Sequence, residues 1–479
     1  MKTEYPDLRL FINGEWRTTD KTQPVVNPAN EEIIGHLPVA GKTELDDALK
    51  AAQQGFKIWS RTSPRQRAEL IRQAAHVMRE RQDEIAQAIT LEQGKPLAES
   101  RLEVIRGAEF FEWDAGEALR TYGRVIPSAQ GIRYIVHHQP IGPVAAFSPW
   151  NFPMSQPSRK VAGALAAGCS IILKAAEETP AGALHIARAF EKVGLPKGVL
   201  NLVFGVPNFI SSHLIPSETT RMVAFTGSTA VGRHLSMMAA EHMTPVLMEL
   251  GGHAPVIVSK HTDVQAAATA SAHRKTRNAG QVCTSPTRFF VHRDIFDEFL
   301  EKMSKDMAAT VVGDGQLKTT SMGPLANARR ISALESFVND AVAVGAKLVT
   351  GGNRIARAGF FFEPTVLANV PNSARVMNEE PFGPLAIVNP FNDIESAIVA
   401  ANSVQFGLAA YGFSNRADEI DLMTDNIEAG NLSINTLEAS LPETPFGGVK
   451  SSGYGREGGS EGIHHYMVTK NVSHSMRIE

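Results

Sequence analysis

The sequence predicts an α/β protein of two domains, each built around a parallel sheet, and three observations predict this. The chain has 479 residues, which is more than one ordinary domain holds. From about residue 143, short apolar runs alternate with helical stretches, as in "SIILK" before "AGALHIARAFEKV". Continuous apolar strands between helices are typical of a parallel sheet covered on both faces. The alternation restarts with "APVIVS" after Gly251 and Gly252, where we place the predicted boundary between the domains.

The first third of the chain is predicted to be helical. "TELDDALKAAQQGFKIWS" begins with a capping-box pattern that runs from Thr43 to Asp46. The next helix is predicted to begin at Ser63, which precedes Pro64. Its apolar residues recur with helical spacing and are Leu70, Ile71, Ala74, Ala75 and Met78. Two β-like segments outside the alternation, "GIRYIVHHQP" and "HYMVTKNVSHS", could pair with each other or across subunits.

Composition and charge exclude several classes of function. The formal net charge of −3 gives no footprint for nucleic acid or for an anionic membrane. Two cysteines cannot form a disulfide framework, and no paired Cys/His spacing indicates zinc. The N-terminal segment lacks a signal-like apolar core, and no run approaches the ~20 apolar residues that span a bilayer. We therefore expect a soluble cytoplasmic protein that binds neither nucleic acid nor membrane.

Cys283 has a setting that points to chemistry. The other cysteine, Cys169, opens an apolar strand-like run, where a cysteine usually serves as a small core residue. Cys283 lies instead in the polar loop "AGQVCTSPT", after a helix predicted near 263–278. Position alone leaves a core residue and a reactive thiol equally open. A reactive thiol needs a lowered pKa or a base, so the interpretation depends on its partners.

Two polar residues at the ends of predicted strands are candidate partners. Glu249 ends the strand in "VLMELGG", and its apolar surroundings would raise its pKa toward that of a useful general base. Asn151, in "SPWNFP", follows a strand, and its side-chain NH₂ could donate to a developing oxyanion. Ligands of open α/β sheets gather at such strand ends. The alternatives are a solvated acid for Glu249 and an Asx turn for Asn151.

Other strand ends carry features of nucleotide binding. "FTGSTAVG" places Gly227 and Ser228 between a strand and a helix, which directs N–H groups at an anion such as pyrophosphate. The segment is neither G-x-G-x-x-G nor a Walker loop, and alone it is weak evidence. Lys174 ends the neighbouring strand, and Glu177 is predicted to start the next helix. Glu177 could bind ribose hydroxyls or only interact favourably with the helix dipole.

Seven segments in order resemble the aldehyde dehydrogenase superfamily: "SPWNFP", "LKAAEETP", "FTGSTAVG", "MELGG", "GQVC", "EEPFGP" and "PFGGVKSSGYGREGG". The resemblance extends from about residue 8 to the C-terminus and is closest to succinate-semialdehyde and 2-oxoglutarate-semialdehyde dehydrogenases. It implies a Rossmann-like cofactor domain, a catalytic α/β domain and a β oligomerisation arm that makes homodimers or homotetramers. The implied bounds are 1–118 with 141–250, then 251–446, and 119–140 with 447–479 for the arm.

The resemblance also implies a role for each site residue. Cys283 is the nucleophile, Glu249 the general base and Asn151 the oxyanion donor. Arg159, Arg277 and Ser440 match residues that hold the distal carboxylate in succinate-semialdehyde dehydrogenases. The cofactor-binding residues implied are Trp150, Lys174, Glu177, Gly205, Gly227, Ser228, Glu380 and Phe382. No metal is implied. Departures from the commoner family sequence, "KAAE", "GSTA" and His253, remove no catalytic group.

The implied reaction is oxidation of an aldehyde to an acid with NAD(P), through a Cys283 thiohemiacetal and a thioester. The implied substrate is a semialdehyde of four or five carbons with a carboxylate at its far end. NAD is expected to be preferred over NADP, because Glu177 would repel a 2′-phosphate. The alternatives are an aldehyde dehydrogenase of broad aliphatic or aromatic specificity, a cysteine hydrolase and a non-catalytic binding protein. A hydrolase would normally need a histidine partner, and none lies at a matching strand or helix end.

Overall fold

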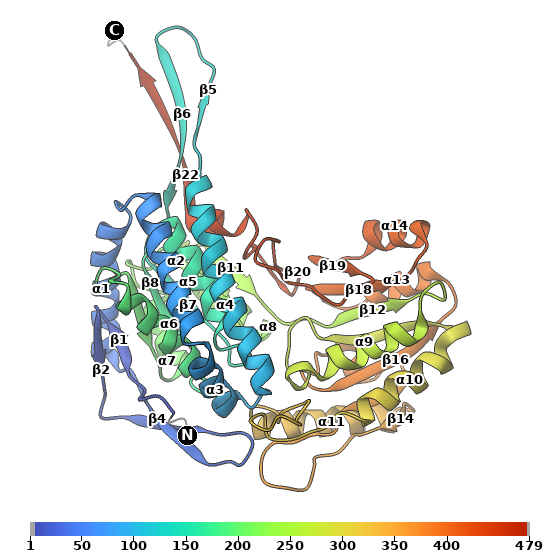
Figure 1. The fold of residues 1–479 in the computed structure, drawn as a ribbon. Helices are drawn as coiled ribbons and strands as arrows, with labels where there is room; N and C mark the ends of the chain where they lie inside the picture. Colours follow the sequence, from blue (N-terminus) through green and yellow to red (C-terminus); the bar gives the residue numbers. More distant parts are fainter. Residues whose placement is uncertain (1–4, 477–479) are drawn as a thin grey trace.

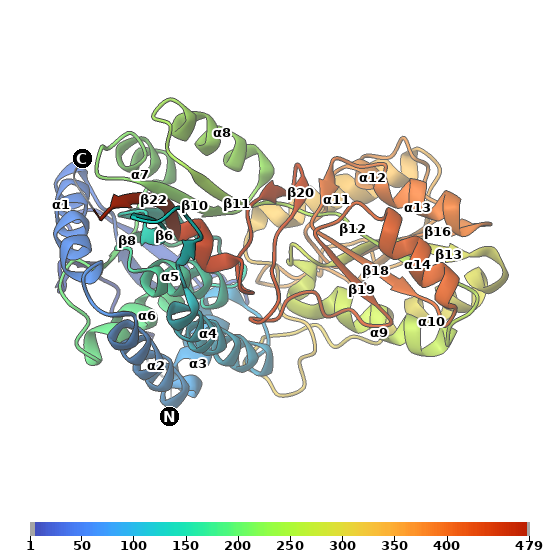
Figure 2. The ribbon, with the colours of Figure 1, turned by 90° about the horizontal axis from the view of Figure 1, so that it is seen from above.

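The computed structural model describes residues 5–476 and contains two large sheets that lie side by side (Figures 1 and 2). The first sheet has the order β2-β1-β9-β8-β7-β10-β11-β21. Its strands are β1 (Leu10–Ile12), β2 (Glu15–Arg17), β7 (Val144–Phe147), β8 (Ile171–Lys174), β9 (Leu200–Val203), β10 (Met222–Thr226), β11 (Val246–Glu249) and β21 (Gly453–Tyr454). Strands β9, β8, β7, β10 and β11 are parallel, in the order 3-2-1-4-5 typical of a Rossmann-like sheet. The predicted α/β class is confirmed.

Helices cover the first sheet in two layers. Those that alternate with the strands are α5 (Ser155–Ala167), α6 (Ala181–Lys192), α7 (Pro207–Leu214) and α8 (Thr229–Ala240). Four helices precede the parallel strands: α1 (Lys42–Trp59), α2 (Pro64–Glu80), α3 (Gln82–Gln93) and α4 (Leu97–Glu117). α2 and α4 pack on α5, and α2 and α3 pack on α6, so α2, α3 and α4 form an outer layer, whereas α1 packs on the strands β1, β8 and β9 themselves (Figure 1). This packing accounts for the helical first third of the chain.

The starts of the first two helices differ in how well the sequence predicts them. Ser63 caps α2 by accepting a hydrogen bond from the Gln66 N–H, and Pro64 follows as predicted. The capping box predicted from Thr43 to Asp46 is wrong. The N-cap is Gly41, whose N–H donates to the Glu44 carboxylate at 2.7 Å. The backbone is still extended at Gly41, so the helix starts earlier and Thr43 already lies in its first turn.

The second sheet has the order β14-β15-β16-β13-β12-β18-β19, and every pairing is parallel except that of β14. Its strands are β12 (Ala254–Val258), β13 (Pro286–His292), β14 (Lys347–Thr350), β15 (Thr365–Ala368), β16 (Leu385–Phe391), β18 (Ala409–Phe413) and β19 (Asn431–Ile434). The chain leaves the first sheet at Glu249 and enters the second at Ala254. β21 then returns to pair with β11, so the chain crosses between the sheets twice.

Side chains alternate across the second sheet. Val256 and Val258 pack in one core with α9 (Val264–Thr276) and α10 (Phe296–Ala308), and Ile257 packs in the other. That other core is covered by α11 (Ala328–Ala343), α13 (Ile394–Asn402) and α14 (Ala417–Asn426). The smaller elements are β3 (Thr22–Val26), β4 (Ile33–Pro38), α12 (Arg375–Asn378), β17 (Phe406–Gly407) and β20 (Val449–Lys450).

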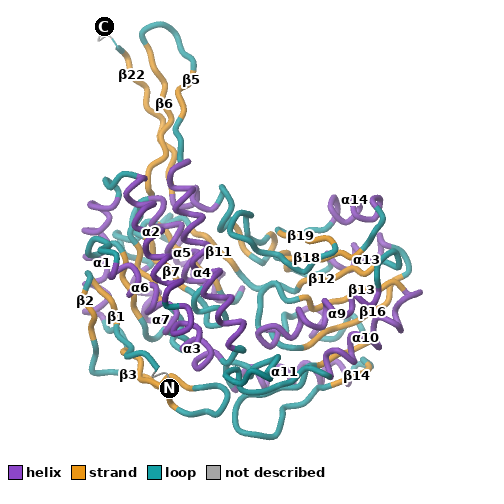
Figure 3. The backbone as a smooth tube through the Cα atoms, viewed as in Figure 1, coloured by secondary structure: helices purple, strands orange, loops and turns teal. Residues whose placement is uncertain are grey.

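A three-stranded sheet projects from the body of the molecule (Figures 1 and 3). β6 (Ile132–Pro140) pairs antiparallel with β22 (Met467–Ser475) along its whole length, and β5 (Arg124–Ile126) lies on the other side of β6. The two β-like segments singled out from the sequence therefore pair with each other. Among residues 5–476, none of the helices combines the length and apolar character that a membrane crossing requires.

Candidate active site

The polar residues predicted from separate segments lie along one edge of the first sheet. Lys174 is the last residue of β8 and Glu249 the last residue of β11, while Asn151 and Gly227 lie just beyond β7 and β10. These strands are parallel and in register, so their carboxyl ends meet at the same edge. The chain moves from β7 to β8 and β9 on one side, and β10 lies on the other side. The crevice between β7 and β10 is thus a topological switch point, the usual place for a ligand.

Cys283 ends a sharply folded loop after α9. Asn278 and Ala279 both have left-handed backbones, with φ of 48° and 51°. Gly280 follows with φ of 69°, and a Cβ there would lie 2.0 Å from the Gly383 carbonyl oxygen, so only glycine fits. The Gln281 side chain donates to the Asn278 carbonyl at 3.1 Å and accepts from the Ala326 N–H at 2.9 Å. The predicted polar loop is therefore a rigid support for the thiol.

Asn151 contacts this loop directly. Its side-chain Nδ2 donates to the backbone carbonyl of Gln281 at 3.0 Å. Its backbone carbonyl accepts from Lys95 Nζ at 2.7 Å and from Asn278 Nδ2 at 2.9 Å. The Asn151 side chain is buried, so its position is set by the protein. An amide nitrogen carries two N–H groups, and one hydrogen bond to Gln281 leaves the other for a substrate oxygen.

Glu249 is a buried carboxylate without a hydrogen-bond partner. The residue is 2% exposed, and neither carboxylate oxygen has a partner among the described residues. Burial raises the pKa of Glu249 well above its usual value, and the nearby Glu457 carboxylate raises it further. The positive charge of Lys160 opposes this shift in the pKa of Glu249. Lys160 Nζ itself pairs with Glu457 at 2.7 Å and donates to Thr226 Oγ1 at 2.6 Å. The raised pKa expected from the apolar sequence around Glu249 is confirmed.

The two thiols have different surroundings. Cys169 is fully buried in the first core, as predicted, and burial raises its pKa to about 11. Cys283 is half-buried and faces a cavity. Burial raises the pKa of Cys283 to about 12, with further contributions from the carboxylates of Glu380 and Glu249. A thiol with this pKa is neutral near pH 7, so its reaction requires a base.

None of the predicted cofactor-binding residues lines the cavity that contains Arg159 and Ser440. Lys174 forms an ion pair with Glu177. Glu177 was expected to start a helix, but α6 begins only at Ala181, and Glu177 lies in the turn before it. Pro180 is the N-cap residue of α6, and the Ala181 N–H at the start of this helix donates to the Glu92 carboxylate at 3.0 Å, so Glu177 does not cap the helix. Among the described residues, the side-chain partner of the Glu177 carboxylate is Lys174.

The other predicted cofactor-binding residues fall into four groups. Ser228 caps α8 and accepts from the Val231 N–H at 3.4 Å, directly after Gly227. The rings of Trp150 and Phe382 meet edge to face at 5.5 Å. Glu380 accepts from the Gly252 N–H at 3.1 Å, and burial raises its pKa to about 7. Gly205, with φ of 139°, packs closely on Val39 and Ala40. The N-terminus of α8, the Lys174–Glu177 ion pair and the rings of Trp150 and Phe382 are together suited to binding a dinucleotide.

Cys283 lines a cavity of about 490 Å³. Arg159 lies in its wall and donates to the Ser440 hydroxyl. The Arg159 guanidinium lies 4.0 Å from the Phe110 ring and 4.8 Å from the Phe446 ring, and its Nη1 is buried without a hydrogen-bond partner. Arg277 lies in the same wall, 5.6 Å from the Phe152 ring. All three residues predicted to hold a distal carboxylate therefore line the cavity that contains the thiol.

Sequence reasoning missed several charged residues near the site, among them Glu103, Arg106 and Glu109 in the cavity wall. Arg274 and Glu438 line the cavity, and Lys160 and Glu457 lie beside Glu249. Arg274 precedes Arg277 by one helical turn, which is a signal that sequence carries. For Glu457 the only signal was its place within "GYGREGG", a segment that resembles the family.

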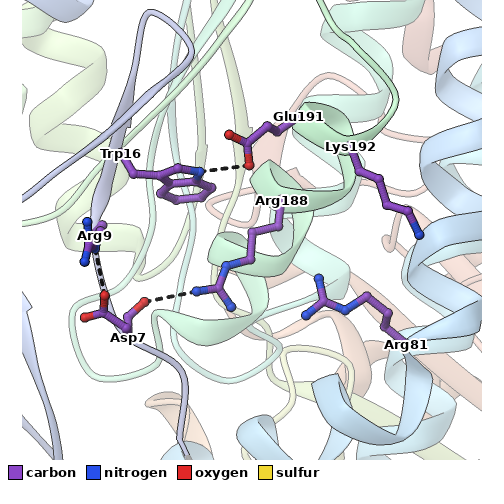
Figure 4. A pocket seen from close by; sticks show the side chains of 7 residues that line it. All are labelled: Asp7, Arg9, Trp16, Arg81, Arg188, Glu191 and Lys192. Atoms are coloured by element: carbon purple, nitrogen blue, oxygen red, sulfur yellow. Dashed lines mark hydrogen bonds and ion pairs between the residues drawn. The ribbon is translucent and has the colours of Figure 1, made fainter.

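A second cavity, of about 620 Å³, lies away from this site, between the N-terminal strands and α6 (Figure 4). Its charged side chains are partnered: Arg9 pairs with Asp7 at 2.7 Å, and Glu191 accepts from Trp16 at 2.9 Å. No residue predicted for the active site lines this cavity. Within residues 5–476, no group of three or more His, Cys, Asp or Glu side chains is arranged to hold a metal ion.

Comparison with known proteins identifies the family. The model of the aldehyde dehydrogenase family matches residues 16–472. The 4-(hydroxymethyl)benzenesulfonate dehydrogenase TsaD1 of Comamonas testosteroni is 45% identical over 464 residues, which are 96% of this chain and 97% of that protein. The NADP(+) succinate-semialdehyde dehydrogenase GabD of Escherichia coli K12 is 40% identical over 465 residues, 96% of each chain.

A solved structure agrees with these matches. The crystal structure of succinate-semialdehyde dehydrogenase from Burkholderia pseudomallei superposes with a TM-score of 0.96 at 41% identity, and the match covers 98% of each chain. The chain therefore belongs to the aldehyde dehydrogenase family, whose members oxidise aldehydes with NAD(P).

Proposed function

We propose that this enzyme oxidises a semialdehyde whose far end carries a carboxylate, such as succinate semialdehyde or 2-oxoglutarate semialdehyde. The observation that supports this most strongly is the buried, unpartnered Nη1 of Arg159 in the wall of the Cys283 cavity. A buried guanidinium is costly unless its N–H groups are paired. A substrate carboxylate would supply that partner, and Arg277 would supply a second guanidinium for it.

A second candidate is an aldehyde that ends in a sulfonate. TsaD1 is named for a benzenesulfonate substrate. The cavity also carries three phenylalanine rings, Phe110, Phe152 and Phe446, against which an aromatic substrate would pack. A sulfonate and a carboxylate both carry one negative charge, so the same arginines would serve either group.

In the proposed mechanism the Cys283 thiol loses its proton to a base, and the thiolate sulfur bonds to the aldehyde carbon. Glu249 is the proposed base: its carboxylate is unpartnered and near enough for its charge to affect the pKa of Cys283. The free N–H of Asn151 and the Cys283 backbone N–H would hold the oxyanion of the resulting thiohemiacetal. Loss of one such donor typically costs about 3 kcal/mol, or ~10²-fold in rate.

Oxidation leaves a thioester on Cys283. NAD(P), when bound, supplies the acceptor for the hydride that the thiohemiacetal carbon loses. Glu249, after it has released the thiol proton to solvent, takes a proton from water, and the hydroxide oxygen bonds to the acyl carbon. The carbon–sulfur bond breaks, and the acid leaves with the thiolate restored. One buried carboxylate with a raised pKa suits both proton transfers.

The proposed cofactor contacts are made by the predicted cofactor-binding residues near the carboxyl ends of the strands of the first sheet. Lys174 and Glu177 would hold ribose hydroxyls, and Gly227 and Ser228 at the start of α8 would hold the pyrophosphate. Trp150, Phe382 and Glu380 would hold the nicotinamide half, and Gly205 would shape the adenine side. We propose NAD as the preferred form, because Glu177 would repel the 2′-phosphate of NADP.

The proposed subunit arm is the sheet of β5, β6 and β22. Its residues Val125, Ile126 and Ile132 are exposed apolar side chains, which a second subunit would cover. We propose the domain division 1–118 with 141–250, 251–446, and 119–140 with 447–479 on the basis of the two sheets and this arm.

The test is aldehyde-dependent reduction of NAD by the purified protein, with kcat/KM measured for four substrates. These are succinate semialdehyde, 2-oxoglutarate semialdehyde, 4-formylbenzenesulfonate and uncharged butanal. The proposal expects one of the two semialdehydes to have the highest value. A higher value for the sulfonate would favour the second candidate. Equal values for butanal and the anionic aldehydes would overturn both and favour broad specificity.

A further inference from the structure

Arg274 and Glu438 form an ion pair at the outer end of the substrate cavity. Arg274 Nη1 lies 3.6 Å from Glu438 Oε1. Both residues line the cavity that contains Cys283, together with Arg277. The same three residues line an adjoining cavity of about 300 Å³. The ion pair therefore stands between the substrate cavity and a second opening.

The two partners are held very differently. The Arg274 side chain is 13% exposed and lies near Tyr411: burial raises the pKa of the Tyr411 hydroxyl, and the Arg274 charge opposes this shift. That hydroxyl donates to the carbonyl of Thr284 at 2.7 Å, next to Cys283. The Glu438 side chain is 63% exposed, on the loop after β19. Arg274 is therefore a buried residue beside the catalytic loop, and Glu438 is the exposed partner, whose side chain is free to move away.

The salt bridges of the cavity leave two of its arginines without a directly paired carboxylate, although Glu457 lies near Arg159 and Glu99 and Glu438 lie near Arg277. Arg106 pairs with Glu109 at 3.0 Å, and Arg274 pairs with Glu438. Arg159 and Arg277 form no ion pair with a carboxylate of residues 5–476. A tail with one negative charge matches these two guanidinium groups. A tail with two negative charges would also need Arg274 as a partner and would be repelled by the Glu438 carboxylate.

We propose that Glu438 is a specificity-determining residue that neutralises Arg274 and so selects singly charged tails over doubly charged ones. The inference rests on the proposed function, since it concerns the same anion-binding cavity. A carboxylate or sulfonate reaches Arg159 and Arg277 without disturbing the Arg274–Glu438 pair. A phosphate monoester, with up to about two negative charges, must compete with Glu438 for Arg274 and is repelled by it.

The test compares the wild type with Glu438→Gln on three aldehydes of similar length: succinate semialdehyde, 3-oxopropyl phosphate and uncharged butanal. Glutamine keeps the size of the side chain and removes its charge. We expect kcat/KM for the phosphate to rise about three- to fivefold at low ionic strength, in line with a partly exposed charge. The value for succinate semialdehyde should change less than about twofold, and that for butanal not at all. The gain should shrink as salt shortens the screening length from about 10 Å at 0.1 M to about 3 Å at 1 M.

Two further variants separate charge from structure. In Arg274→Gln/Glu438→Gln the gain for the phosphate should vanish, because no freed guanidinium remains. Glu443→Gln is the matched control: this exposed acid lies on the same loop but does not line the cavity, and all three values should stay unchanged. Thermal unfolding of each variant would report any loss of folding.

The outcomes distinguish this inference from the function on which it rests. If the wild type prefers succinate semialdehyde to butanal but Glu438→Gln leaves the ratio of phosphate to carboxylate values unchanged, the inference is overturned alone. The same gain in the double variant would also overturn it. A wild type with no preference for the acid would overturn the proposed function and this inference together.

Discussion

Arg159 donates a hydrogen bond to the Ser440 hydroxyl across 281 residues of sequence. The contact joins α5, beside the first sheet, to the loop that follows the second sheet. Its guanidinium is flanked by the rings of Phe110 and Phe446, and one nitrogen is left buried and unpartnered. The anion site proposed for the substrate is therefore completed only when both halves of the chain have folded against each other.

The first prediction concerns this guanidinium. Arg159→Gln should lower kcat/KM for succinate semialdehyde by about 10- to 100-fold, because a charged hydrogen bond of ~1.5–3 kcal/mol is lost. Butanal should lose less than about threefold, since it has no anion to bind. Arg159→Lys should not restore the acid, because an ammonium cannot replace a planar fork. Equal losses for the acid and for butanal would contradict a role in anion binding.

The second prediction separates the two catalytic groups. Cys283→Ala should abolish oxidation, because the thiol forms the covalent bond, and should leave NAD binding nearly intact. Glu249→Gln should slow the first reduction of the nicotinamide, because the thiol loses its base, and should slow thioester hydrolysis as well, with the acyl group detected on Cys283 by mass spectrometry.

Cys169→Ala serves as the control for that experiment, since this cysteine is buried in the first core, and the variant should keep its activity. Steady turnover of Glu249→Gln at the native rate would mean that another group is the base.

The third prediction is a pH shift. The pKa of Glu249 is raised by burial and then by Glu457. Glu249 acts as a base only when ionised, so thioester hydrolysis should increase as pH rises through this pKa. Glu457→Gln removes the negative charge that raises it, so the pKa should fall and the rising limb should move to lower pH. The measurement is the single-turnover rate of hydrolysis against pH. A limb that stays in place or moves to higher pH would exclude this coupling.

The residues that sequence located best are those at strand ends. Lys174 and Glu249 each end an apolar strand, and parallel pairing brings such ends to one edge without any knowledge of the packing. Helix starts were harder, as the shift from Thr43 to Gly41 shows, because neighbouring residues offer competing caps. The start of α6 was also predicted too early: the helix begins at Ala181, and Glu177 lies in the turn before it.

Pairings across the two sheets could not be predicted. Arg274 and Glu438 come from different elements, and nothing in either segment indicates the other. Lys160 directly follows Arg159, yet it faces Thr226 and Glu457 while Arg159 faces the substrate cavity. Successive residues of a helix point about 100° apart, so their partners are set by the surrounding fold.

The last prediction concerns the choice between NAD and NADP. Glu177 lies in the turn after β8 and is held by Lys174, so a carboxylate faces the place proposed for the adenosine ribose. A 2′-phosphate there would bring up to about two further negative charges beside it. We expect the wild type to have the higher kcat/KM with NAD. Glu177→Gln should raise kcat/KM for NADP by about tenfold, the effect of removing ~1.4 kcal/mol of repulsion, and should lower that for NAD only slightly. Glu178→Gln is the matched control, because Glu178 is adjacent in sequence but pairs with Arg329, and it should leave the ratio unchanged. A wild type that favours NADP, or a ratio that Glu177→Gln does not alter, would show that Lys174 and the surrounding backbone decide the preference without Glu177.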